Sequence, residues 1–73
     1  MIGKVLREIR VKNNLKQTEL AKKVGFAKNT ISQYELGKRK VEFDKVEKIA
    51  RACGYRIMFY NDTTEEVIPL DIK

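Results

Sequence analysis

Three polar residues in one short stretch could form hydrogen bonds with the edges of nucleic-acid bases. Lys28, Asn29 and Gln33 lie within six positions of one another. A lysine ammonium can donate to guanine O6 and N7, and the amides of Asn29 and Gln33 can each bond an adenine edge in bidentate fashion. Ala27 precedes them and could touch a thymine methyl group. Such a set is useful only if one element presents its members together, so the surrounding pattern matters.

That pattern predicts two short helices joined by a tight turn. Leu20 and Val24 are four apart on one helical face, and Gly25 follows where a left-handed residue would end the helix. Ile31 and Tyr34 are three apart and define the inward face of a second helix, expected at about residues 28–36. The turn between the helices has about three residues, which is the spacing of a helix-turn-helix.

A larger set of residues at this spacing resembles the Cro/C1-type helix-turn-helix repressors, the XRE-like family. The resemblance covers roughly residues 2–55, and the residues that carry it are Gln17, Ala21, Gly25, Ile31 and the run Tyr34-Glu35-Leu36-Gly37-Lys38. It implies a mainly α fold, with a four-helix lambda-repressor-like domain at residues 1–54. Residues 55–73 would form a C-terminal β-strand or hairpin.

The same resemblance implies a structural ion pair between Arg10 and Glu35. Its members are 25 positions apart, and both are present. The alternative is a solvated arginine that interacts with the dipole at the end of the first helix.

Two further amphipathic helices are expected on either side of the helix-turn-helix. Their apolar stripes are Ile2, Val5, Leu6 and Ile9 in the first helix, and Phe43, Val46, Ile49, Ala50 and Cys53 in the fourth, which Gly54 should end. Two helix starts depart from the family pattern, because neither Lys16 nor Ala27 has a side-chain acceptor for free backbone N–H groups. Such a loss costs about 1 kcal/mol.

The C-terminal segment changes from helical to alternating periodicity. Residues 55–60 are rich in β-forming side chains and predict a strand, residues 61–64 a turn, and residues 67–72 a second strand that Pro69 confines to an edge. A lone hairpin is marginal in water. We therefore expect pairing across a twofold axis in a homodimer, through Tyr55, Ile57, Met58, Phe59 and Tyr60. The alternative is a hairpin folded back on its own helices.

Charge is concentrated on the predicted helix-turn-helix. The net charge is +6, and residues 1–40 carry eleven Lys or Arg against three Glu. A basic surface on this motif favours a polyanionic partner. Phosphate contacts are expected from Lys16, Gln17 and Thr18 at the start of the second helix, from Thr30 and Ser32, and from Lys38, Arg39 and Lys40 after the third.

These features predict a sequence-specific regulator of transcription that binds a palindromic double-stranded DNA operator as a homodimer, and we expect it to be a repressor. The alternative is an antitoxin that binds its own operator and a toxin protein. An enzyme is disfavoured, because the chain has no histidine, Ser32 has no candidate base and Cys53 lies on a core stripe. No metal or cofactor is expected. With no signal-peptide pattern and no membrane-spanning run, the cytoplasm is the expected location.

Overall fold

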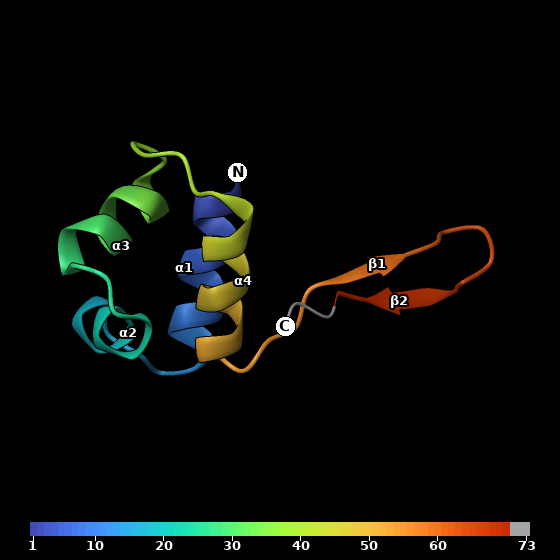
Figure 1. Ribbon diagram of the computed structural model, residues 1–73, viewed down its shortest axis with the longest axis horizontal. Coiled ribbons are helices and arrows are strands. Elements are labelled where there is room, and N and C mark those ends of the chain that lie inside the picture. Colours follow the sequence, from blue (N-terminus) through green and yellow to red (C-terminus); the bar gives the residue numbers. More distant parts are fainter. Residues whose placement is uncertain (71–73) are drawn as a thin grey trace.

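Four helices form one body from which a β-hairpin projects. The computed structural model describes residues 1–70. Helices α1 (Ile2–Lys12), α2 (Gln17–Val24), α3 (Lys28–Leu36) and α4 (Phe43–Ala52) are followed by strands β1 (Met58–Tyr60) and β2 (Val67–Pro69). In Figure 1, α2 and α3 lie on one side of α1 and α4, and the hairpin extends on the other side. This architecture confirms the mainly α fold with a C-terminal hairpin.

Every helix contributes side chains to a single core. Helix α1 packs against α3 and α4, and α2 packs against the same two helices. The rings of Phe26 and Tyr34 meet edge to face, with centroids 6.4 Å apart. Cys53 is buried, as its place on the apolar stripe predicted. The buried cluster consists of Leu6, Leu20, Ala21, Val24, Ile31, Tyr34, Ile49 and Cys53.

The apolar stripes of α1 and α4 are only partly buried, which corrects the sequence prediction. Ile2, Val5 and Phe43 are 43%, 50% and 54% exposed, whereas Leu6 and Ile49 are buried. The reason is that α2 and α3 cover only one side of the α1–α4 pair (Figure 1). The uncovered apolar residues line an open groove on the other side.

Glycines end two of the helices, and a carboxylate accepts a backbone hydrogen bond at the start of one of them. Gly25 and Gly37 adopt left-handed conformations after α2 and α3, with φ of 78° and 75°. At the start of α2, the backbone N–H of Lys16 donates to the Glu19 carboxylate at 2.7 Å. In a capping box, the backbone N–H of the capping residue bonds the carboxylate three positions later, and a lysine can still form this half of the motif. The bond therefore offsets part of the stability that was expected to be lost because Lys16 has no side-chain acceptor. Ala27 makes no side-chain capping bond.

The hairpin is antiparallel and shorter than the sequence predicted. Its register pairs Met58 with Pro69, Phe59 with Ile68 and Tyr60 with Val67. Residues 55–57 lie outside the strand, although the N–H of Leu70 donates to the carbonyl of Ile57 at 2.9 Å. The second strand ends at Pro69, and the predicted Ile72 lies outside the described residues.

The hairpin does not pack on the helices of its own chain. All six strand residues are exposed, and the hairpin projects away from the helical body in Figure 1. The folded-back alternative is therefore wrong for this structure. The two strands pair within one chain, and pairing across a twofold axis remains a prediction.

Candidate nucleic-acid interface

The predicted base-contacting residues share the solvent face of α3. Lys28, Asn29 and Gln33 are exposed, as is Ala27 at the start of the helix. The opposite face of α3 is locked into the core, where Ile31 is 1% exposed and Tyr34 6%. Fixing one face of a helix in the core gives the other face a defined orientation. The structure thus presents these four side chains together on one rigid surface.

Helix α2 holds α3 through a three-residue turn, residues 25–27. Ala21 is 4% exposed, and its carbonyl accepts the N–H groups of Gly25 and Phe26, each at 2.9 Å. A methyl side chain at this position lets the chain reverse close to α2. The geometry of the turn is therefore determined by residues close to it in the sequence.

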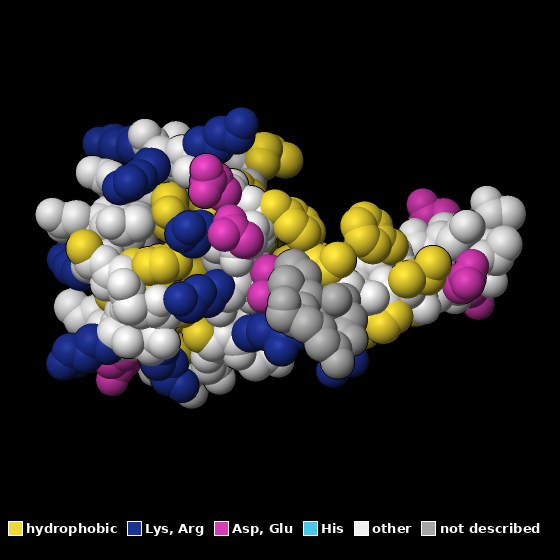
Figure 2. Space-filling model, viewed as in Figure 1, with side chains coloured by type: hydrophobic (Ala, Val, Ile, Leu, Met, Phe, Trp, Pro, Cys, Tyr) yellow, Lys and Arg dark blue, Asp and Glu magenta, His cyan; other side chains and the backbone are white. Residues whose placement is uncertain are grey.

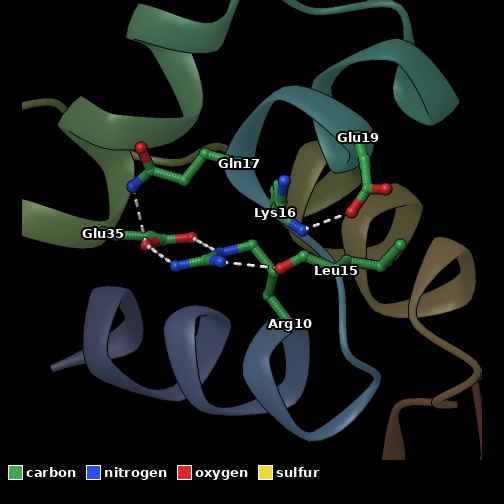
Figure 3. Close-up of polar contacts among 6 residues, drawn as sticks. All are labelled: Arg10, Leu15, Lys16, Gln17, Glu19 and Glu35. Atoms are coloured by element: carbon green, nitrogen blue, oxygen red, sulfur yellow. Dashed lines mark hydrogen bonds and ion pairs between the residues drawn. The ribbon is translucent and has the colours of Figure 1, made fainter.

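A buried ion pair connects α1 to the end of α3. Arg10 donates from Nε to Glu35 Oε2 at 2.6 Å and from Nη2 to Oε1 at 3.0 Å. Arg10 Nη1 also donates to the carbonyl of Leu15 at 2.8 Å. Both charged residues are 9% exposed, and the hydrogen bonds that Arg10 donates to the Glu35 carboxylate raise the pKa of Arg10. Figure 3 shows this network between α1, α3 and the turn before α2.

Gln17 belongs to the same network. Its Nε2 donates to Glu35 Oε1 at 3.1 Å, and its side chain is partly buried at the first position of α2 (Figure 3). The expectation of an amide free to hold a phosphate therefore needs correction. One N–H of the amide already bonds Glu35, so only the other could reach a phosphate.

The other phosphate candidates border α3 on the surface. Lys38, Arg39 and Lys40 are exposed in the loop after α3, with Arg39 Cζ 6.0 Å from the centroid of the Tyr34 ring. Figure 2 shows Lys and Arg side chains over the helical body, and acidic ones at the hairpin tip. Of the remaining candidates, Lys16 and Thr18 are exposed, and Thr30 and Ser32 are partly buried.

Sequence reasoning missed Gly3. This glycine is buried, and a Cβ added to it would lie 2.7 Å from the carbonyl oxygen of Glu35 and closer still to that of Tyr34. Helix α1 can therefore approach the end of α3 only because residue 3 has no side chain. The available signal was its position: Gly3 shares a helical face with Leu6 and Arg10, at i, i+3 and i+7.

Within residues 1–70, no cluster of three or more His, Cys, Asp or Glu side chains could hold a metal ion. None of the helices in that range is long and apolar enough to span a membrane.

A helix-turn-helix with an exposed polar second helix beside a basic loop defines a nucleic-acid-binding module. The helix-turn-helix family model matches residues 6–59. The chain belongs to this family, the Cro/C1-type regulators of transcription that bind DNA.

Two relatives are similar over most of the chain. The cryptic phage CTXphi transcriptional repressor RstR of Vibrio cholerae is 37% identical over 57 residues, which is 78% of this chain and 51% of the repressor. The control protein C.BamHI of Bacillus amyloliquefaciens is 38% identical over 55 residues, 74% of this chain and 68% of that protein. The chain thus matches about half the length of RstR.

Proposed function

We propose that this protein is a sequence-specific repressor of transcription that reads double-stranded DNA with α3. The observation that carries the proposal is the exposure of Lys28, Asn29 and Gln33 on one face of a helix whose other face is fixed in the core. The relative named as a transcriptional repressor supports the same function.

In the proposed complex, α3 enters the major groove, where each base pair presents a distinct pattern of donors and acceptors. Lys28 donates to guanine, Asn29 and Gln33 bond adenine edges, and Ala27 contacts a thymine methyl group. The loop at residues 38–40 and the start of α2 contact phosphates, which fix register without reading sequence. Bound at a promoter, the protein excludes polymerase.

A homodimer would let the protein read a palindromic operator. One helix as short as α3 contacts only a few base pairs, whereas two copies related by a twofold axis place their helices about 34 Å apart, one turn of the duplex. The hairpin lies on the side of α1 and α4 away from α3 (Figure 1), so it can pair without covering the DNA-binding face. The proposed dimer contacts include Tyr55, Ile57, Met58, Phe59 and Tyr60.

The test is selection of binding sites from random duplexes, followed by measurement of variants on the selected site. The double variant Lys28→Ala/Gln33→Ala should lose at least about tenfold in affinity, because a specific base contact contributes about 1–3 kcal/mol. Lys4→Ala removes one exposed positive charge from α1 and serves as control, with an affinity within about threefold of the wild type. A double variant that binds the selected site as tightly as Lys4→Ala would overturn the assignment of α3.

The antitoxin alternative gains no support from the comparisons, since neither relative's name refers to a toxin. Recovery of the chain with the product of a neighbouring reading frame would favour it over the repressor.

A further inference from the structure

The chain exposes two apolar surfaces that nothing within residues 1–70 covers. One is the α1–α4 groove defined above, and the other is the hairpin. Figure 2 shows hydrophobic side chains running from the helical body along the hairpin. The residues of the groove used below are Ile2, Val5, Phe43, Val46, Tyr55 and Ile57.

The register of the hairpin shows which of its faces continues the groove. Successive side chains of a strand point to opposite faces, and paired residues share a face. Phe59 is therefore on the same face as its partner Ile68, and also on the face of Ile57, two positions earlier. Ile57 lines the groove. Phe59 and Ile68 thus extend the apolar surface of the groove, whereas Tyr60 is on the opposite face.

The hairpin needs a covering surface to be stable. A two-stranded hairpin is marginal in water without packing. Phe59 and Ile68 are 61% and 55% exposed, and Phe43 and Tyr55 in the groove are 54% and 43% exposed. At about 200 Å² for each aromatic side chain, Phe43, Tyr55 and Phe59 expose on the order of 300 Å² together. A stable dimer buries about 800 Å² on each partner, so the exposed aliphatic residues bring the total to the right scale.

The hairpin of the same chain is not seated in this groove. The hairpin points away from the helical body (Figure 1), and Ile57, just before β1, lines the groove. Each strand of the hairpin has three residues, which span about 10 Å at about 3.3 Å per residue. Helix α1, with 11 residues, is about 16 Å long. The paired strands are therefore short enough to lie along a groove that runs beside α1.

Charge also favours contact between a hairpin and a helical body. Residues 58–70 contain the acidic Asp62, Glu65 and Glu66 and no basic residue, whereas residues 1–54 contain fourteen Lys or Arg against six Asp or Glu. An acidic hairpin tip is therefore attracted to the body of another molecule.

We infer that each hairpin lies in the α1–α4 groove of a second copy of the chain, with Phe59 and Ile68 against Val5 and Phe43. This inference rests on the homodimer in the proposed function and names the surface that forms it. A twofold axis makes the contact reciprocal, because the hairpin of each chain then fills the groove of the other.

Matched pairs of variants test the inference through the dimer dissociation constant, measured by sedimentation equilibrium without DNA. Phe59→Ser is compared with Val67→Ser, since both residues are exposed and have a cross-strand partner, but Val67 is on the hairpin face opposite Phe59. Val5→Lys is compared with Val11→Lys, since both valines are about half exposed on α1 but only Val5 lines the groove. Phe59→Ser and Val5→Lys should each weaken the dimer at least tenfold, and their controls by less than threefold.

A mixture of isotope-labelled and unlabelled wild-type chains then shows which chain fills the groove. Filtered nuclear Overhauser contacts between Phe59 and Val5 across the two kinds of chain are the expected result. A monomer with these contacts within one chain, or one that binds only an unrelated protein through the groove, overturns the inference. A dimer that Val5→Lys leaves unchanged also overturns it, although the proposed homodimer then stands. DNA binding through α3 is measured separately, so its loss would not be confused with any of these results.

Discussion

The backbone of Gly3 in α1 lies directly against the carbonyl oxygen of Glu35 in α3, 2.7 Å from where a Cβ would stand. Residue 35 is also the residue whose side chain bonds Arg10 of α1. The first helix therefore holds the end of α3 through both backbone proximity and a buried ion pair. This double contact makes α1 a determinant of how α3 is oriented.

Gly3→Ala should destabilise the fold, even though alanine is the better helix former. The gain in helix propensity is about 1 kcal/mol, while forcing a methyl group against two backbone carbonyls costs about 1–3 kcal/mol and shifts the helices apart. We expect a net loss in the free energy of unfolding, measured with urea, and weaker binding to the selected duplex. Lys4→Ala, a substitution of the exposed neighbouring residue in α1, is the control. A Gly3→Ala protein more stable than wild type would contradict this close approach.

Arg10→Met should cost about 3–5 kcal/mol of unfolding free energy, because Glu35 is then left buried without its partner. This is a large part of the stability of a domain of this size. The double variant Arg10→Met/Glu35→Leu should recover much of the loss, since apolar pairs can replace buried ion pairs. If the single and the double variant unfold at the same urea concentration, the loss of stability in Arg10→Met arises from lost packing at Arg10 and not from an unpaired carboxylate.

Lys38→Ala should weaken binding to every duplex by a similar factor. Lys38 is exposed in the loop after α3 and is expected to contact phosphate. Removal of one phosphate contact lowers the slope of log affinity against log salt concentration by about one. Titrations of a selected and an unrelated duplex at several salt concentrations measure that slope. The control is Lys12→Ala, which removes an α1 lysine that pairs with Glu8 and should leave the slope unchanged.

The thiol of Cys53 should react slowly with a disulfide reagent in the folded protein. Burial raises the pKa of this thiol, and the nearby charges of Arg10 and Lys23 oppose the shift. Because the pKa is raised on folding, the associated stability is complete below the unfolded value of about 9 and is lost as pH rises through the folded value. At pH 8 we expect the reaction to be at least about tenfold slower than in urea. Equal rates would show that the C-terminal end of α4 opens readily.

Most of the helical body could be predicted from the sequence because its signals are local. The end of α3 follows from Gly37, and the periodicity of Ile31 and Tyr34 places the polar residues on the opposite face, whereas Ala27 gives no capping signal at the start of the helix. The Arg10–Glu35 pair was expected from family resemblance, since no local pattern connects residues 25 positions apart. The structure supplies its geometry, along with the Gln17 bond that the sequence did not indicate.

By itself, the sequence determined which residues form helices, which face of each helix is apolar and where the positive charge lies, because these depend on neighbours within about two turns. Only the tertiary structure decided how those faces meet. The stripe of α1 reads as core along its whole length, yet Val5 stays half exposed because α2 and α3 pack on the other side. Likewise, Gly3 looks like an ordinary helical glycine until α3 passes against it. Burial depends on how separate helices are placed, and periodicity within one helix does not encode that placement.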